Sequence, residues 1–430
     1  MHAHMTMTDV PSMHASSPRE NLTVLADKYL RAVSGDVIRV FIQLAYFYLV
    51  ANTLTITEFG LFATASSVGI VLSRVSGFGF LSPLYRIATV KPQLIGAYAA
   101  GYVLAVIVSM PFVLAIAFAV HTFFFKSSLA LLPFVLIVLS EVLLWRSVEA
   151  VINVNKGLER FGTASFIIVF GFSVKALAAV VLAIQAAPDL VQWAHIYFVS
   201  QGLAALIVIA LFFPKQRLKF RAKLYVRRLP DALSVSGAEV LFYIQSELDK
   251  LAVLALGGPA AAGVYAIIMR LVDLTALPVR TFSTLLTQRL MRRPELLKTL
   301  SVRLGFEVGV FLVSTAAMLA MLVVLWIKPD ILGSNVATAA SMLSLVILVP
   351  AFRNLIEYQA ELLYGRGQTF VRLLNYALLA IVKLGLVYAL LTSRTDPADW
   401  LIWTNAVFAS LYLISASVTY SVLGRPTKPV

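Results

Sequence analysis

The chain has 430 residues, of which 60% are hydrophobic and 13% are charged, and its mean hydropathy is +0.89. So little polar surface excludes a water-soluble globular protein and predicts a polytopic membrane protein. The formal charge of +14 would suit a nucleic-acid partner, a class that the placement of the basic residues excludes below.

Residues 1–28 are polar and contain His2, His4 and His14 among Ser, Thr, Pro and Met. No apolar stretch follows a basic start, so we expect no cleavable signal peptide. We interpret this polar segment as a disordered cytoplasmic tail. The alternative, a metal site, is not expected from three scattered histidines. The chain has no cysteine, which excludes disulfides and thiolate ligands. We therefore expect neither a metal nor a cofactor.

Apolar stretches long enough to cross a bilayer follow the tail. A span needs about 20 predominantly apolar residues to cross about 30 Å of hydrocarbon. The sequence predicts an all-α protein with twelve spans at 31–53, 57–83, 95–120, 129–152, 162–186, 190–213, 232–255, 259–284, 304–328, 334–358, 368–392 and 399–423. The predicted domains are an N-lobe at 29–213, a basic cytoplasmic linker at 214–231, a C-lobe at 232–424 and a cytoplasmic tail at 425–430.

The two halves of the chain repeat. At a shift of 208 residues, Glu149, Gly157 and Val174-Lys175 fall on Glu357, Gly365 and Val382-Lys383. At a shift of 202, SGDVIRVFIQ (34–43) lies over SGAEVLFYIQ (236–245), and at 203, FGLFA (59–63) lies over AGVYA (262–266). Six spans in each half keep the repeats in the same orientation. We therefore expect two parallel six-helix lobes that rock around a central cleft.

The basic residues gather on one side of the predicted membrane when the N-terminus is cytoplasmic. That side receives Arg86, Lys91, Lys156, Arg160, the seven basic residues from Lys215 to Arg228, Arg289, Arg292, Arg293, Lys298, Arg366, Arg425 and Lys428. The opposite side receives only Lys126, Lys328 and Arg394. This is the positive-inside pattern. The positive charge therefore reports a topology with both termini cytoplasmic, and we expect no nucleic-acid partner.

Some charges fall inside the predicted spans, where each costs roughly 2.5 to 3.5 kcal/mol at the bilayer centre. The basic ones are candidates for holding an anionic substrate, since the arginine fork suits a diphosphate: Arg39, Arg74, Arg270, Lys175, Lys383 and Lys250. An alternative stays open for each of them. The two repeated lysines could instead hold helices together through a carboxylate. Asp36 and Asp273 stand three residues from Arg39 and Arg270 and could neutralise them, and a neighbouring helix could supply an acid to Arg74.

Carboxylates inside the spans are candidates for coupling transport to a proton or sodium ion: Asp36, Glu141, Glu239, Glu247, Asp249, Asp273 and Glu307. Glu247 stands three residues before Lys250, a spacing that suits either an internal ion pair or a coupling site. We interpret Glu149 and Glu357 as interfacial, beside Arg146 and Arg353.

The chain lacks the sequence motifs of several enzyme classes. It contains no GxxxxGK[ST], HExxH or GxSxG sequence, so neither nucleotide-driven transport by this chain nor hydrolysis is expected. The predicted outer loops are very short, and the loop between the seventh and eighth spans is little more than GGPAAAG (257–263). A polymerase or glycosyltransferase with an outer catalytic loop is therefore not expected.

Three stretches resemble a known family: ITEFGLFATASSVGIVLSRVSGFGF (56–80), NVNKGLERFGTASF (153–166) and SELDKLAVLALGGPAAAGVYAIIMRL (246–271). They are similar to bacterial polysaccharide (O-antigen or exopolysaccharide) flippases of the multidrug/oligosaccharidyl-lipid/polysaccharide exporter (MOP) superfamily. The likeness extends over nearly the whole chain through loose motifs. Twelve predicted spans differ from the fourteen typical of the peptidoglycan-precursor branch, which makes that narrower substrate less expected.

The resemblance implies passage of a polyprenyl-diphosphate-linked oligosaccharide from the cytoplasmic to the outer leaflet of the bacterial inner membrane. It implies that Arg39, Arg74 and Arg270 face a central cavity. The expected partners are this substrate, membrane lipids, a coupling H⁺ or Na⁺ and polysaccharide assembly proteins. The alternative is a cation-coupled drug or metabolite exporter of the same fold. Such exporters favour acidic cavities, whereas acids and bases in these spans are nearly balanced.

Overall fold

The computed structural model describes residues 38–276, 300–394 and 396–423. Within these ranges the chain forms helices and no strand, which confirms the all-α prediction. Asp36 and the predicted tails at 1–28 and 425–430 lie outside the described residues.

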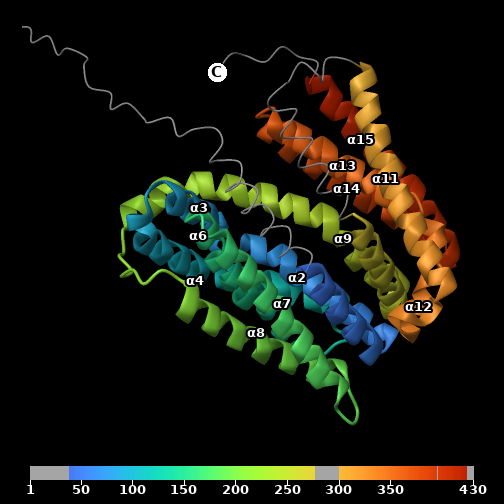
Figure 1. Cartoon of the computed structure of the whole chain (residues 1–430), viewed down its shortest axis with the longest axis horizontal. Helices are drawn as coiled ribbons and strands as arrows, with labels where there is room; N and C mark the ends of the chain where they lie inside the picture. Colours follow the sequence, from blue (N-terminus) through green and yellow to red (C-terminus); the bar gives the residue numbers. More distant parts are fainter. Residues whose placement is uncertain (1–37, 277–299, 395, 424–430) are drawn as a thin grey trace, which may run out of the picture.

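The helices form two lobes joined by one long helix (Figure 1). The N-lobe holds helix Ile38–Thr53, α2 (Ile56–Val75), α3 (Leu81–Val90), α4 (Ile95–Val120), α5 (Leu131–Leu139), α6 (Arg146–Gly157), α7 (Phe161–Ala183) and α8 (Leu190–Phe212). The long helix is α9 (Ala222–Thr275), and the C-lobe continues with α11 (Leu300–Ile327), α12 (Ser334–Ala340), α13 (Val349–Gly365), α14 (Thr369–Ser393) and α15 (Pro397–Leu423).

Among the described residues, nine helices are long and apolar enough to cross a membrane, or ten if the pair Ser334–Ala340 and Leu343–Gly365, bent by 53°, forms one span. One source of the difference from twelve is α9, which covers two expected spans. It turns at Gly258, whose φ of +80° is a left-handed conformation that glycine adopts without strain. A second source is Ile38–Thr53, which begins where the described part begins. The count of twelve spans stays a prediction.

The second expected span, 57–83, is interrupted. A capping box starts α2: Thr55 Oγ1 accepts the Glu58 amide hydrogen at 3.2 Å, and the Glu58 carboxylate accepts that of Thr55 at 3.0 Å. The α-helix ends at Val75, and Gly77, Phe78 and Gly79 follow with φ of +71°, +47° and +71°. These left-handed residues redirect the chain into α3, a turn that apolar content could not reveal.

The lobes meet at the end of the molecule opposite the basic residues. A Cβ on Gly60 in α2 would lie 2.3 Å from the Pro259 oxygen, and one on Gly263 in α9 would lie 2.0 Å from the Ile56 oxygen. Only glycine allows two helices to approach this closely. Gly60 and Gly263 are the positions that the sequence repeat superposes at a shift of 203, so equivalent residues of the two repeats pack at the lobe interface.

A pair of asparagines closes the same end. Asn335 donates its side-chain hydrogens to the carbonyls of Ala51 and Leu54, each at 2.8 Å. Asn52 donates to the Leu332 carbonyl at 2.7 Å and accepts from the Asn335 amide at 3.2 Å. Figure 1 shows α12, whose second residue is Asn335, beside the end of the N-lobe. We call this end of the molecule the closed end, and the end that carries Arg86, Lys156 and the 214–231 segment the basic end.

The 214–231 segment is anchored to the N-lobe. Gln216 accepts the Gly96 amide hydrogen at 3.0 Å and donates to the Pro92 carbonyl at 2.9 Å. The helix α9 begins inside this segment, at Ala222, and continues without a break into the seventh expected span. Figure 1 shows α9 running between the N-lobe helices and the C-lobe helices.

Candidate functional site

A cavity of about 700 Å³ lies between helix Ile38–Thr53, α2, the α5–α6 segment, α7, α8 and α9. Tyr85 and Lys156 line it at the basic end and are exposed. Val50, Phe59 and Phe62 line its other end and are buried. The cavity therefore opens toward the basic end and stops where Gly60 and Gly263 bring α2 and α9 together.

Among the described residues, twelve charged side chains line the cavity. Seven are cationic, Arg39, Arg74, Arg146, Lys156, Lys175, Lys250 and Arg270, and five are acidic, Glu141, Glu149, Glu239, Glu247 and Asp273. Nine of these twelve were among the residues singled out from the sequence. The other three are Arg146, Glu149 and Lys156, which we had placed near the membrane surface.

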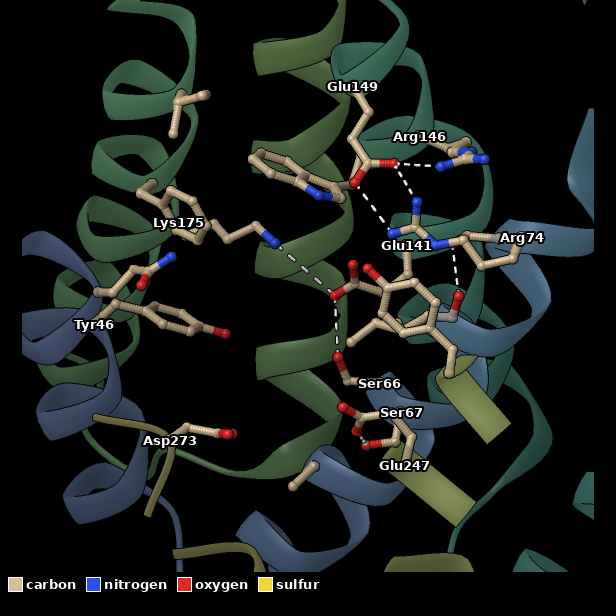
Figure 2. A pocket seen from close by; sticks show the side chains of 18 of the residues that line it. Tyr46, Ser66, Ser67, Arg74, Glu141, Arg146, Glu149, Lys175, Glu247 and Asp273 are labelled. Carbon is tan, nitrogen blue, oxygen red and sulfur yellow. Dashed lines mark hydrogen bonds and ion pairs between the residues drawn. The ribbon is translucent and has the colours of Figure 1, made fainter. Parts of the chain in front are cut away.

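An arginine–glutamate network forms the upper wall in Figure 2. Arg74 holds Glu149 with both guanidinium nitrogens, at 3.0 and 3.1 Å, and Arg146 donates to the same carboxylate at 2.7 Å. Arg146 also reaches Glu239 on α9 at 3.2 Å, and the Arg74 guanidinium lies 4.3 Å from the ring centroid of Tyr243. A neighbouring helix thus supplies the acid that Arg74 lacks in its own sequence neighbourhood. The network also ties α9 to the N-lobe.

Glu149 shows what local spacing could reveal. Its pairing with Arg146 follows an i,i+3 spacing and agrees with the expectation that the two residues lie side by side. Its place in the cavity depends on Arg74, which is 75 residues away in the chain. No sequence signal pointed to the aromatic wall residues Trp145, Tyr197 and Tyr243, because apolar helices contain many such rings.

Lys175 faces the cavity from α7. Its ammonium lies 3.9 Å from Glu141 Oε1 and 4.3 Å from the ring centroid of Trp145 (Figure 2). Glu141 Oε1 also accepts hydrogen bonds from Tyr197 at 2.6 Å and Ser66 at 3.0 Å. A π-helical turn over Ser140–Trp145 carries both Glu141 and Trp145, and such widened turns often occur at functional sites.

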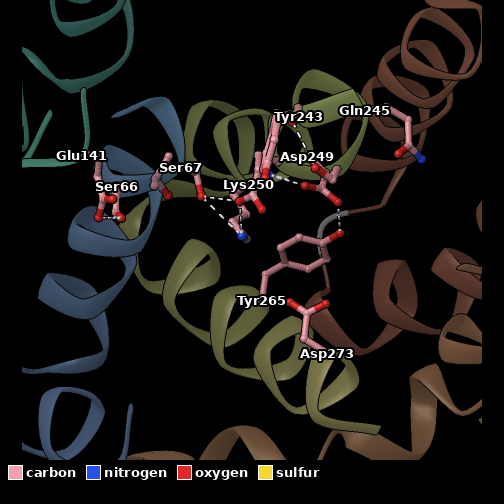
Figure 3. A network of polar contacts seen from close by, with 12 residues as sticks. Ser66, Ser67, Glu141, Tyr243, Gln245, Asp249, Lys250, Tyr265 and Asp273 are labelled. Atoms are coloured by element: carbon pink, nitrogen blue, oxygen red, sulfur yellow. Dashed lines mark hydrogen bonds and ion pairs between the residues drawn. The ribbon is translucent and has the colours of Figure 1, made fainter. Parts of the chain in front are cut away.

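Lys383, the repeat partner of Lys175, occupies a different environment. Its ammonium lies 2.6 Å from Asp249 Oδ2 and donates to the Gln245 carbonyl at 2.8 Å. Tyr265 donates to the same Asp249 oxygen at 2.8 Å (Figure 3). Lys383 and Asp249 border a hollow of only about 10 Å³ and do not line the main cavity. The repeat therefore places a lysine in each lobe, but their carboxylate partners, Glu141 and Asp249, are not equivalent positions of the repeat. Lys175 faces the cavity and Lys383 is packed inside the C-lobe.

Two more expected pairs have clear outcomes. Lys250 and Glu247 form the internal ion pair that their spacing allowed, and Ser67 on α2 donates to Glu247 at 2.7 Å. Asp273 does not neutralise Arg270. It pairs with Arg353 on α13 at 3.0 Å. Within the described part of the chain, Arg270 has no ion pair or hydrogen bond, although it lines the cavity.

Glu307 is buried away from the cavity. It accepts hydrogen bonds from Gln359 at 3.0 Å, Tyr412 at 2.8 Å and Tyr420 at 2.7 Å, inside the C-lobe. Among the residues that the structure describes, no group of three or more His, Asp or Glu side chains is placed to hold a metal ion. The cavity side chains can bind a substrate through ionic contacts and hydrogen bonds.

No family model matches the chain, and no curated protein matches it. Solved structures do match. An inward-facing multidrug resistance MATE family transporter of the MOP superfamily is 15% identical, with 96% of this chain and 97% of that chain covered and a TM-score of 0.58. The chain therefore shares the fold of this transporter. This agrees with the fold that the sequence resemblance implied.

Two further MOP structures extend the comparison. A MOP superfamily transporter from Pyrococcus furiosus, described as having a binding pocket of reverse polarity, is 14% identical over 92% of this chain and 95% of that chain, with a TM-score of 0.58. An outward-facing MATE structure is 13% identical over 92% and 94%, with a TM-score of 0.54. These neighbours are thus described in an inward-facing form and an outward-facing form, the two states that alternating access requires of a transporter.

Proposed function

We propose that this protein is a flippase that moves a polyprenyl-diphosphate-linked oligosaccharide from the cytoplasmic to the outer leaflet of the bacterial inner membrane. Both termini would be cytoplasmic, so the basic end would be the cytoplasmic end and the cavity would be open to the cytoplasm. The observation that carries the proposal is Arg270, a cavity cation without an ion-pair partner among the described residues, in a wall where cations outnumber acids.

The charge arrangement supports an anionic headgroup. The acids of the wall are largely committed to protein cations: Glu149 and Glu239 to the two arginines, Glu247 to Lys250, and Asp273 to Arg353. Among the described residues, an entering diphosphate would therefore meet one guanidinium without an ion-pair partner, that of Arg270, rather than a free carboxylate. Arg270 would hold the diphosphate through paired hydrogen bonds. Arg39, Arg74, Lys175 and Lys250 would surround the rest of the headgroup.

The contacts of the charged wall residues also suggest how substrate binding could be coupled to an ion. Lys175 is 3.9 Å from Glu141, beyond the length of a good hydrogen bond. A substrate oxygen could therefore attract the ammonium without breaking a short contact. Protonation of Glu141, Glu239, Glu247 or Asp273, or sodium binding to one of them, would change the balance of cavity charge. We propose such a step as the link to an ion gradient, and we assign Lys383, Asp249 and Glu307 to the packing of the C-lobe.

The test is a flipping assay with purified protein in liposomes. A fluorescent polyprenyl-diphosphate oligosaccharide placed in one leaflet becomes accessible to a quencher when it reaches the other. Arg270→Gln should slow flipping about 10-fold or more, because a hydrogen bond to a charged group contributes about 1.5 to 3 kcal/mol. Arg270→Lys should recover part of the rate, because it keeps the charge and loses the fork.

The matched control is Lys126→Gln, which removes an exposed cation outside the cavity. This variant should flip at the wild-type rate. Wild-type flipping by Arg270→Gln would contradict the assigned role of Arg270, and absence of flipping by the wild-type protein would contradict the proposed function.

A cation-coupled exporter of drugs or metabolites is the second candidate. The aromatic side chains Tyr46, Phe62, Trp145, Phe172 and Tyr197 line the same cavity and could stack on an apolar cation. The MATE structures with this fold are described as multidrug resistance transporters. Efflux of a cationic dye by the same liposomes, without flipping of the lipid-linked sugar, would favour this candidate.

A further inference from the structure

A second hollow lies on the surface at the basic end. It has a volume of about 230 Å³ and shares no lining residue with the main cavity. Its walls come from α3, the start of α4 and the first turns of α9, through Pro83, Arg86, Ile87, Val90, Lys91, Tyr98, Arg228 and Asp231. The hollow therefore sits where the N-lobe touches the helix that leads into the C-lobe.

The backbone turn before α3 builds this hollow. A Cβ on Gly79 would lie 2.2 Å from the Ala232 oxygen, so glycine at this position lets α9 approach the turn. Arg86 on α3 then reaches Asp231 on α9 at 2.7 Å. These two contacts fix α3 and α9 on opposite sides of the hollow.

The hollow carries an excess of positive charge. Its single carboxylate, Asp231, is paired with Arg86. Lys91 and Arg228 line the same hollow and are exposed, and neither has an ion pair within the described part of the chain. Two exposed cations from different elements, converging on one concave site, suit an anion that can receive hydrogen bonds from both.

Apolar side chains next to these cations indicate which class of anion the hollow would bind. Val90 lines the hollow and is 72% exposed. Along the adjoining segment Leu218, Phe220 and Val226 are 60%, 67% and 71% exposed and alternate with exposed basic residues. Exposed apolar side chains interleaved with Lys and Arg are typical of a surface that lies in the headgroup layer of an anionic membrane. A soluble anion would gain nothing from the apolar groups.

We propose that this hollow binds the phosphodiester headgroup of an anionic phospholipid from the membrane leaflet at the basic end. Lys91 and Arg228 contact the phosphate, and the lipid chains lie along Val90 and the exposed apolar residues nearby. Because the two cations belong to the α3–α4 connection and to α9, the bound headgroup bridges them. It stabilises the arrangement in which the start of α9 rests on the N-lobe.

The test compares lipid binding by the full-length protein in nanodiscs of phosphatidylcholine with added phosphatidylglycerol. Native mass spectrometry measures the apparent affinity for phosphatidylglycerol, and thermal unfolding measures the stabilisation that it gives. Lys91→Gln with Arg228→Gln should weaken binding roughly 25-fold, since each basic residue near an anionic lipid contributes roughly a factor of five. Both side chains are exposed and unpaired among the described residues, so this variant should fold normally.

Lys215→Gln with Arg227→Gln is the matched control. It removes the same charge from the same face outside the hollow, and we expect it to change the affinity by less than about threefold. An equal loss in both double variants would overturn the site, because the basic face as a whole would then attract the lipid. Equal stabilisation by inorganic phosphate in detergent would overturn the assignment to a lipid headgroup.

Discussion

The two lysines that the repeat superposes should respond differently to the same substitution. Lys383→Met removes an ammonium 2.6 Å from Asp249 and leaves that carboxylate with a side chain only 1% exposed. Breaking a buried pair by removing one partner typically costs about 3 to 5 kcal/mol, because the remaining charge is uncompensated. Tyr265 and the Lys250 amide still donate to Asp249, so we expect a loss near 3 kcal/mol.

Lys175→Met should lower the free energy of unfolding less than Lys383→Met does, and it should slow transport. The Lys175 ammonium is 3.9 Å from Glu141, which keeps hydrogen bonds from Ser66 and Tyr197 and lines the cavity. The lost contacts are a long ion pair and a cation–π contact with Trp145, together worth about 1 to 2 kcal/mol. Under the proposed function this variant flips the lipid-linked sugar more slowly, because a cavity cation is gone.

The assay is denaturant unfolding in detergent micelles followed by fluorescence, run beside the flipping assay. Replacing both partners, as Asp249→Leu with Lys383→Met, should recover most of the lost stability, because apolar side chains of similar volume pack without an uncompensated charge. Unfolding of Lys383→Met at the wild-type denaturant concentration would refute the reasoning. A double variant no more stable than Lys383→Met would do the same.

Three further predictions follow from the lobe contacts and the charge network. Gly60→Ala should lower stability by about 1 to 3 kcal/mol in thermal unfolding, because the new Cβ meets the backbone of α9. The control Gly385→Ala should not lower stability, because its Cβ meets nothing within 4 Å. Equal losses in both variants would contradict this account. Because the chain has no cysteine, the double variant Asn52→Cys, Asn335→Cys can be cross-linked specifically. Cross-linking should stop transport until a reductant is added. Continued transport would mean that the closed end need not open. Glu149→Gln should lower the free energy of unfolding by about 3 kcal/mol, because two guanidinium groups lose their shared carboxylate, and an unchanged unfolding curve would show that Glu239 alone suffices.

The sequence determined several features without tertiary information. Hydropathy predicted a helical membrane protein, because a backbone inside lipid must satisfy its own hydrogen bonds. The repeat predicted two lobes, and it superposed Gly60 and Gly263, which meet at the closed end. Helical spacing allowed the Glu247–Lys250 ion pair, one of the two readings that the sequence left open. These inferences depend on composition or on neighbours within one helical turn, and the chain alone supplies both.

Only the tertiary structure decided the partners of the other charges. Asp273 pairs with Arg353 and leaves Arg270 unpaired among the described residues, although spacing equally allowed an Arg270–Asp273 pair. Arg74 takes its acid from α6, and Lys175 and Lys383 take acids from non-equivalent helices of their lobes. The physical reason is that such contacts depend on how each helix is rotated and on where the lobes touch. Both follow from the packing of side chains far apart in the sequence.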